Sequence, residues 1–328
     1  MAKKILTIAV CAYNMEEYLE QALESCLIEE HDKLEVLIMN DGSTDRTEEI
    51  AKKYCNEYPD TFVLINKENG GWGSNLNEAV KLAKGKYFKE MDADDWFETY
   101  NLQKLVNILE TQDIEVVLTN HRYCYPDRVV DNVPKWSKYR GSDMNLNDAD
   151  CFYFPIWDAA FLTNIVREHY KNLPKHTLYT DNLFILYLLP YIKTVKFVDF
   201  VVYNYRLGRD GQSVNISSLK KHYKELVYVL KLAFDFCEKL DKEKMNKHVN
   251  EKLTSTYVIF AGYLLKVGDM KDAEIKKYFV KLEKKLKRDF NEIYKQTNKR
   301  KKLFLLRITN YAAFGFVVKF IKKTGKGI

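Results

Sequence analysis

Short apolar runs alternate with segments of helical spacing through the first 120 residues, and this pattern leaves few folds open. The apolar runs cover residues 5–13, 34–41, 61–66, 87–91 and 114–120. Between them, apolar residues recur three and four positions apart, as in Leu19, Ala22, Leu23 and Cys26. Strands joined by helices of this length form parallel βαβ units. We therefore predict an α/β fold with a Rossmann-like, mostly parallel sheet.

Polar residues gather where these strands end. Asn14, Asp41, Asn69 and residues 92–95 all fall at this position in the chain. Because ligands of open parallel sheets bind beyond the carboxyl ends of the strands, we expect these residues to line one site. After the second strand, the sequence predicts a helix with Ser43 or Thr44 as its N-cap.

The second half of the chain changes in character. Residues 122–205 are less regular and rich in aromatic residues, and residues 195–206 read as a further strand. From about Ser217 the pattern is that of long helices, over residues 220–240, 244–267 and 272–295. We expect a first domain over residues 1–216 and a helical region over residues 217–328.

Basic charge is concentrated in the C-terminal tail. After Glu292 there is no acidic residue but ten Lys and Arg, whereas the rest of the chain holds 42 basic against 46 acidic residues. This argues against a nucleic-acid-binding surface and for a tail that meets an anionic membrane surface. Arg307, Asn310 and Lys319 interrupt the tail too often for a membrane span, so an interfacial helix is expected. The alternative is a helix packed on the helical region or in an oligomer contact.

The cysteines and the N-terminus indicate a compartment. The six cysteines form no CxxC pair and no regular framework, which favours reduced thiols. The apolar run that begins at Ile5 is interrupted at Asn14 and Glu16, so it reads as a strand rather than a signal peptide. We expect a cytoplasmic protein, held at the inner face of the cell membrane if the tail binds lipid.

The segment DADD, residues 92–95, raises a chemical question. Three carboxylates this close repel one another unless a cation lies between them. Hard divalent cations such as Mn²⁺ or Mg²⁺ prefer such oxygen ligands. Asp92 and Asp94 alternate on an extended chain and can face one side, whereas Asp95 is expected to point away and cap the next helix. The alternative is three solvated turn residues.

Two further segments are weaker evidence for a binding site when each is taken alone. NDGSTDRT, residues 40–47, is either a plain strand-to-helix turn or a place where Asp41 accepts a base or ribose hydroxyl. NGGWGSN, residues 69–75, is neither a dinucleotide fingerprint nor a P-loop. A glycine turn before a helix still allows an anion to approach the helix N-terminus.

Together, these segments resemble family 2 glycosyltransferases, which are inverting enzymes with a GT-A fold. The resemblance rests on AVCAYNMEEYLEQALESCL, on VLIMNDGSTDRT and on DADD, and it extends over residues 4–213. It implies transfer of a sugar from a nucleotide-diphosphate donor, by family habit a UDP-sugar, to a hydroxyl acceptor. It further implies dependence on Mn²⁺ or Mg²⁺ and a place in cell-surface polysaccharide or teichoic-acid synthesis, with a glycan or lipid-linked acceptor.

The resemblance also assigns residues to the donor side. Asp94 would be the main metal ligand and Asp92 would face the ribose or the metal. In the glycine segment Asn75 and Leu76 replace the family's Ala and Arg, so the contacts of that arginine are not expected here. The remaining donor-site residues would be Ala12, Tyr13 and Asn14 near the base, Asp41 at the base or ribose, and Asn69, Gly71 and Asn77 in the glycine segment.

The catalytic base and the acceptor side follow from the same resemblance. YTDNLFILYLL places Asp181 where the family has its base, with Thr180 instead of the usual glutamate; a plain helix cap is the alternative. YNYRLGRDGQSVN offers Arg206, Arg209 and Ser213 to the diphosphate, with Arg209 preferred, although an arginine here could form a surface ion pair. The acceptor side would hold Trp96, Trp157 and Asp158.

Two other classes of function remain open from the sequence. A nucleotidyltransferase also combines a parallel sheet with metal-binding aspartates, but it would release pyrophosphate. A non-catalytic scaffold of the same fold would bind membrane without turnover. An oligomer is compatible with either class.

Overall fold

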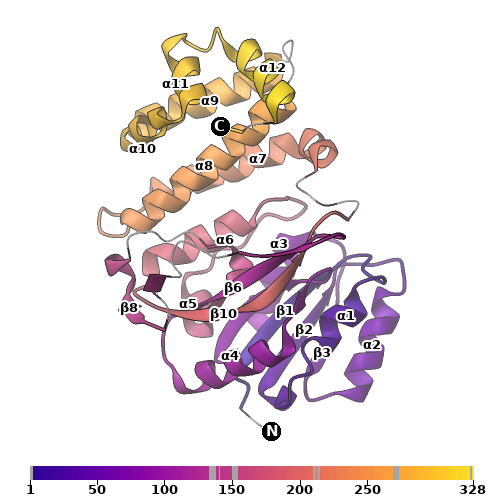
Figure 1. The fold of residues 1–328 in the computed structure, drawn as a ribbon. Coiled ribbons are helices and arrows are strands. Elements are labelled where there is room, and N and C mark those ends of the chain that lie inside the picture. Colours follow the sequence, from indigo (N-terminus) through magenta and orange to yellow (C-terminus); the bar gives the residue numbers. More distant parts are fainter. Residues whose placement is uncertain are drawn as a thin grey trace. The chain divides into compact units, whose positions relative to one another are not determined.

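The computed structural model describes residues 3–132, 138–139, 141–149, 154–209, 212, 215–268, 273–325 and 327–328. The chain forms two compact units, Met1–Arg209 and Asp210–Ile328 (Figure 1). The first unit holds the sheet and the second is helical.

In the described residues of the first unit, ten strands form one mixed sheet. Eight follow the order β3-β2-β1-β4-β9-β6-β10-β5, with β7 beside β6 and β8 beside β10. Strands β1, β2, β3 and β4 are parallel to one another, and β6 is parallel to β10, whereas β9 runs antiparallel between β4 and β6. The bounds are β1 Leu6–Ala12, β2 Leu34–Asn40, β3 Phe62–Asn66, β4 Tyr87–Asp92, β5 Trp96–Phe97, β6 Val116–Cys124, β7 Val129–Asp131, β8 Asp143–Asn145, β9 Ala159–Leu162 and β10 Thr194–Arg206.

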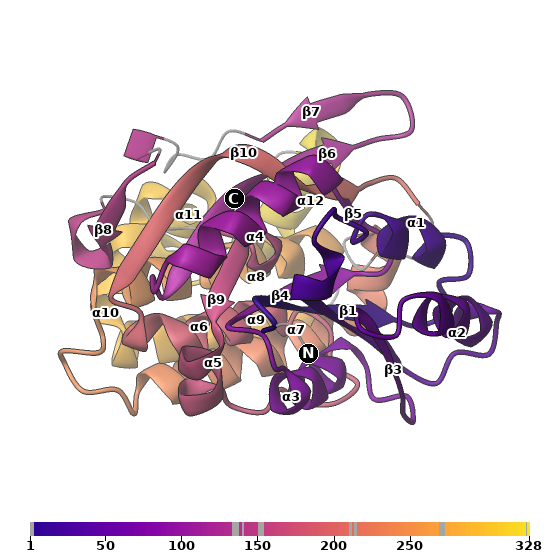
Figure 2. The same cartoon turned by 90° about the horizontal axis from the view of Figure 1, so that it is seen from below.

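Helices cover both faces of this sheet, which confirms the predicted α/β fold. One face carries α1 (Leu19–Glu24), α2 (Thr47–Glu57) and α4 (Thr99–Thr111), and the other carries α3 (Trp72–Leu82), α5 (Thr163–His169) and α6 (Asp181–Leu188). Figure 2 shows α4 lying against β6 and β10. Strand β1 is fully buried, and its side chains alternate between the two faces. Short 3₁₀ turns in the described part of the chain include His31–Lys33, Leu146–Asp148, Ile156–Asp158, Leu189–Tyr191 and Thr297–Lys299.

Two local predictions were wrong. Helix α2 begins at Thr47, so neither Ser43 nor Thr44 is its N-cap. Both residues instead bond to Asn14, whose backbone N–H donates to Ser43 Oγ and whose Oδ1 accepts from the Thr44 N–H. The helix expected over residues 272–295 is interrupted at Phe290, which separates α9 (Ala273–Asp289) from α10 (Asn291–Gln296).

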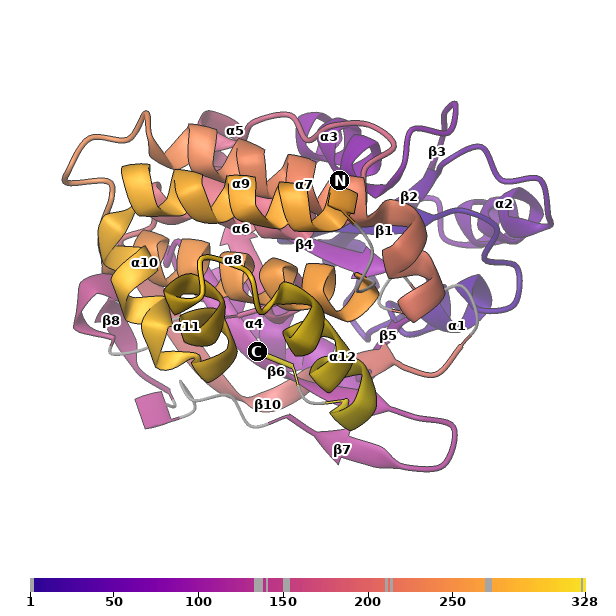
Figure 3. The same ribbon diagram turned by 90° about the horizontal axis from the view of Figure 1, so that it is seen from above.

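A buried ion pair links helices of the second unit. Figure 3 shows the long helices α7 (Ile216–Cys237), α8 (Lys247–Val267) and α9 side by side. Glu283 of α9 is fully buried and accepts hydrogen bonds from Arg307 at 2.7 and 2.9 Å and from Tyr311 at 3.2 Å. The Arg307 guanidinium also lies 3.8 Å from the ring centre of Tyr294. Arg307 therefore ties the tail to the bundle and does not belong to a solvent-facing basic surface.

The tail folds into α11 (Lys301–Ile308) and α12 (Phe314–Thr324), and both bury one side. Phe314, Val318 and Ile321 of α12 are almost fully buried. The alternative of a helix packed on the helical region is therefore realised for this side. Among the described residues, no helix is both long and apolar enough to span a bilayer.

Candidate active site

Three aspartates meet at the carboxyl end of β4. Asp92 ends the strand and lies beside Cys11 of β1 in the sheet. One carboxylate oxygen from each of Asp92, Asp94 and Asp95 lies within 4.8 Å of the others. Asp94 and Asp95 are buried and Asp92 is partly buried. A group of carboxylates this compact is suited to hold a divalent cation.

Asp95 belongs to this cluster, so the prediction that it points away and caps α4 was wrong. The Asp95 N–H donates to the Asp92 carbonyl at 3.0 Å, and this turn brings the Asp95 side chain back toward Asp92. The Tyr203 hydroxyl donates to Asp95 Oδ2 at 2.7 Å, and the Arg206 N–H donates to Oδ1 at 2.7 Å. Helix α4 starts later, with Glu98 as its N-cap.

Burial and mutual repulsion make the cluster hold protons. Loss of solvent raises the pKa of Asp92 to about 7, and the charge of Asp94 adds to the shift. Burial, followed by the charges of Asp94 and Asp92, raises the pKa of Asp95 well above its usual range. Burial, followed by the charge of Asp92, likewise raises the pKa of Glu90, which accepts a hydrogen bond from the Trp72 indole at 3.2 Å. Positive charge placed here would relieve the repulsion.

Two arginines bring that positive charge. Arg209 Nε donates to Asp94 Oδ2, and the nearby charge of Asp94 raises the pKa of Arg209 although burial opposes the shift. Arg206 Nε donates to the Asp94 carbonyl at 2.7 Å. The Arg206 guanidinium lies between two rings, 4.7 Å from Trp96 and 5.0 Å from Tyr18. Trp96 thus lies at the edge of the aspartate cluster.

Asp41 builds the neighbouring loop and is almost fully buried. Its Oδ1 accepts from Lys67 Nζ and, at 2.9 Å, from the Gly70 N–H. Its Oδ2 accepts from the Gly71 N–H at 2.8 Å. The carboxylate predicted to meet a base or ribose is therefore bonded to the glycine turn.

The rest of the glycine segment is fixed in the same way. Gly71 has φ +79° and ψ 169°, a region open almost only to glycine, and an added Cβ would lie 3.3 Å from the His176 nitrogen. Asn69 Nδ2 donates to the Asp41 carbonyl at 2.9 Å. Asn77 bonds to Leu173 at 2.8 and 2.9 Å, so it connects α3 to the segment before α6.

The residues at the end of β1 and directly after it differ in accessibility. Ala12 is buried, whereas Tyr13 is 47% exposed at the same edge of the sheet. Asn14 has φ +52° and links this loop to Ser43 and Thr44. Tyr13 and Asn14 are both exposed, and Tyr13 offers an aromatic ring to a ligand.

Asp181 is the first residue of α6, and Thr180 is the N-cap, so Asp181 is not itself the cap. The charge of Asp181 contributes to the raised pKa values of Asp92 and Tyr205. This interaction shows that Asp181 and the aspartate cluster share one electrostatic environment. Ser213, predicted on the donor side, lies outside the described residues.

Trp157 lies on an aromatic layer beside the cluster. Its ring stacks on Tyr205 with centroids 4.8 Å apart, and it lies 6.2 Å from Tyr203. Asp158 points elsewhere: it is fully buried, and its carboxylate bonds to His121 Nδ1 at 2.8 Å. The structure therefore joins Trp157 to the cluster and assigns Asp158 to the interior.

Comparison with known proteins identifies this arrangement. The family model described as Glycosyl transferase family 2 matches residues 7–170, half of the chain. The chain belongs to glycosyltransferase family 2. An uncharacterized glycosyltransferase of Haemophilus influenzae is 29% identical over 175 residues; the match covers 50% of this chain and about half, 54%, of that relative.

Two solved structures have the fold of this glycosyltransferase. S. aureus TarS 1-349, in complex with UDP-GlcNAc, superposes with a TM-score of 0.70 at 18% sequence identity. The superposition covers 98% of this chain and 92% of the TarS chain. The mannosyltransferase PcManGT from Pyrobaculum calidifontis, in complex with GDP-Man and Mn²⁺, has a TM-score of 0.57 at 15% identity, over 99% and 89% of the two chains. The predicted GT-A fold with a helical C-terminal extension is confirmed.

Several residues of this glycosyltransferase site had escaped prediction from its sequence. Tyr203 and Tyr18 contact the aspartate and arginine cluster from distant parts of the chain. Lys67 and Glu90 are charged groups beside the predicted residues. Glu90 had a usable signal, because a strand residue two positions before Asp92 faces the same side of the sheet.

Proposed function

We propose that this glycosyltransferase is an inverting enzyme that moves one sugar from a UDP-sugar to a hydroxyl acceptor. The observation that carries the proposal is the cluster of Asp92, Asp94 and Asp95, with Arg209 on Asp94, at the carboxyl edge of parallel strands. Such an edge is where α/β sheets bind ligands, and carboxylates paired with arginine suit a metal-bound diphosphate. The complexes of TarS with UDP-GlcNAc and of PcManGT with GDP-Man and Mn²⁺ support a nucleotide-sugar donor.

The acidic cluster fits Mn²⁺ or Mg²⁺. Asp94 and Asp92 would be the ligands from the chain, because their carboxylates approach each other within 4.8 Å and hard cations prefer oxygen. Asp95 is held by Tyr203 and would keep the other two side chains in place. When bound, the ion would supply positive charge to the departing diphosphate.

Arg209 would exchange partners when the donor binds. It pairs with Asp94, and a guanidinium is also the side chain best matched to a phosphate. A cation at Asp94 would replace this contact and leave the guanidinium for the diphosphate. Arg206, held between Trp96 and Tyr18, would stay in place and line the same side.

The nucleoside would lie over the loops after β1 and β2. Tyr13 offers an exposed ring to the base, and Ala12 precedes it as the last residue of β1. We assign Asp41 an indirect role: its carboxylate holds the Gly70 and Gly71 N–H groups, which shapes the turn before α3. Asn14, Asn69 and Asn77 would stabilise the same loops through their bonds to neighbouring segments. Ser213 is retained as a phosphate contact from the resemblance.

Asp181 would act as the catalytic base. Inversion is a single displacement, so the acceptor oxygen bonds to the anomeric carbon as the bond to the diphosphate breaks. A carboxylate must take the proton of the acceptor hydroxyl on the face opposite the diphosphate. Asp181 is the first residue of α6, where the helix dipole favours the ionised carboxylate. Its charge also interacts with that of Asp92.

The acceptor would lie against the aromatic layer. Trp157, stacked on Tyr205, and Trp96, under Arg206, offer ring faces of the kind that pack against sugars. We propose a glycan or a lipid-linked glycan as acceptor, in the synthesis of a cell-surface polysaccharide or teichoic acid at the inner face of the cell membrane.

The test is the Asp181→Asn variant with a panel of UDP-sugars and glycan acceptors. We expect the wild type to release UDP, not pyrophosphate, and to form the inverted anomer by NMR. Asp181→Asn should lose at least about 100-fold in kcat, the usual contribution of a general base, while UDP binding with Mn²⁺ persists. Asp113→Asn, an exposed carboxylate at 90% exposure, is the matched control and should be unchanged. Near-normal turnover by Asp181→Asn would remove this residue from the role.

A further inference from the structure

Each of the two tail helices presents apolar side chains to solvent. Phe304 and Ile308 of α11 are 47% and 63% exposed, and Phe316 and Phe320 of α12 are 65% and 45% exposed. The opposite side of each helix is buried. The buried residues are Leu306 in α11 and Phe314, Val318 and Ile321 in α12. We call the four exposed residues the tail face. An apolar surface that the second unit does not cover marks an interaction site.

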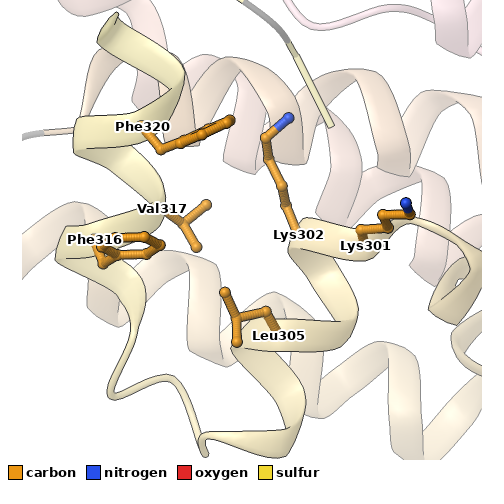
Figure 4. Close-up of a pocket in the computed structure, with 6 residues that line it drawn as sticks. All are labelled: Lys301, Lys302, Leu305, Phe316, Val317 and Phe320. Carbon is orange, nitrogen blue, oxygen red and sulfur yellow. The ribbon is translucent and has the colours of Figure 1, made fainter. Parts of the chain in front are cut away.

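A groove runs through this surface. It has a volume of about 290 Å³ and almost wholly apolar walls. Figure 4 shows Leu305 of α11 and Val317 of α12 pointing into the space between the helices, with Phe320 and Lys302 closing one end. Lys301 and Phe316 complete the lining. The groove is therefore an apolar slot with ammonium groups at its rim.

The charged side chains of the two tail helices are all basic. Lys301, Lys319, Lys322 and Lys323 are exposed on the same two helices. No acidic residue follows Glu292 in the sequence. An apolar strip bordered by lysines matches a layer of acyl chains below anionic headgroups.

We propose that the tail face docks on a membrane surface that carries anionic phospholipid, with an acyl chain in the groove between α11 and α12. The lysines would lie at the phosphate level, and the four apolar side chains would enter the acyl boundary. A second copy of the chain fits less well, because a two-fold contact would place the lysines of both copies against each other. The proposal concerns the second unit and does not depend on the reaction of the first.

Vesicle flotation of the full chain tests this proposal. The probes are vesicles of phosphatidylcholine alone and with 30% phosphatidylglycerol. The variant Phe316→Ser/Phe320→Ser should bind anionic vesicles about 10- to 100-fold more weakly, since each exposed ring loses its transfer into the acyl region. Tyr228→Ser, at 45% exposure on α7, is the matched control for an exposed aromatic in the same unit and should bind as the wild type does.

Charge is tested separately from apolar contact. Lys322→Glu/Lys323→Glu should weaken binding by at least about fivefold per charge removed, and added salt should weaken the wild type. Lys281→Glu/Lys284→Glu, exposed lysines of α9 with the same change in net charge, is the control. Melting curves of all variants establish that each is folded.

Three results would overturn the proposal. The wild type could fail to float with anionic vesicles, or the tail variants could bind as well as their controls. Alternatively, sedimentation velocity could show self-association that Phe316→Ser/Phe320→Ser abolishes without any vesicle binding, which would make a second copy the occupant. A tail variant that loses vesicle binding but still releases UDP from a UDP-sugar in the presence of a soluble acceptor would support membrane docking independently of the proposed reaction.

Discussion

Replacing Arg209 by Gln should strengthen the binding of Mn²⁺ in the absence of nucleotide. Arg209 Nε donates to Asp94 Oδ2, and Asp94 is the carboxylate proposed as the main metal ligand. The guanidinium and the ion therefore compete for one oxygen. Removing the guanidinium should therefore strengthen Mn²⁺ binding, whereas removing a group that ligates the ion would weaken Mn²⁺ binding.

The size of the effect follows from the contact. The side chains of Arg209 and Asp94 are only 22% and 10% exposed, so solvent screens their pairing weakly. A hydrogen bond between charged groups in such a setting contributes about 1.5–3 kcal/mol. Because a competitor raises the apparent dissociation constant by its own pairing constant, Arg209→Gln should bind Mn²⁺ about 10- to 150-fold more tightly.

The assay is a titration of free Mn²⁺ by electron paramagnetic resonance, without nucleotide and then with UDP. With UDP present, Arg209→Gln should instead bind Mn²⁺ more weakly than the wild type, since the variant lacks the guanidinium that would contact the diphosphate. Arg206→Gln is the control: it removes the same charge nearby, but its side chain bonds to the Asp94 carbonyl and not to the carboxylate. Unchanged or weaker Mn²⁺ binding by Arg209→Gln without nucleotide would refute the competition.

Three further predictions concern the site and the second unit. Because burial and the Asp94 charge raise the pKa of Asp92 to about 7, a proton must leave before an ion binds, so nucleotide-free Mn²⁺ affinity should rise about tenfold from about pH 6 to about pH 8. A flat profile by the same titration would contradict the shift, and Asp92→Asn should remove the dependence. Gly71→Ala forces an alanine into a region open almost only to glycine and should lower the free energy of unfolding by about 1–3 kcal/mol in urea titrations; no loss would argue against the turn geometry. Arg307→Ala leaves the buried Glu283 carboxylate without its cationic partner and should cost about 3–5 kcal/mol by the same method, whereas a loss below about 1 kcal/mol would mean that the pair contributes little.

The parallel part of the fold could be predicted because its strands are short apolar runs that alternate with segments of helical spacing. The structure forms β1, β2, β3 and β4 on these runs, and β1 and β2 are buried at every position. Strand β9 could not be predicted in the same way. It has four residues, and its antiparallel place between β4 and β6 depends on pairing with segments more than 30 residues away.

The site shows the same division between local and distant information. That Asp92 and Asp94 lie together follows from their spacing on one short segment. The direction of Asp95 does not, because it depends on a turn and on the hydroxyl of Tyr203, 108 residues later. Asp41 gives a similar lesson, since its carboxylate is bonded to Lys67 and the glycine turn through contacts that no local pattern indicates.

The central claim is that the aspartate cluster binds a metal and a nucleoside diphosphate together. The most direct test is the melting temperature of the wild type and of Asp94→Asn with UDP, GDP, dTDP or CDP, each with and without Mn²⁺. Ligands that bind the folded state raise stability by mass action, about 2.7 kcal/mol at 100 times the dissociation constant. We expect UDP to stabilise the wild type only when Mn²⁺ is present, and Asp94→Asn to lose that gain. Stabilisation by UDP that is equal without metal, or equal in Asp94→Asn, would contradict the account.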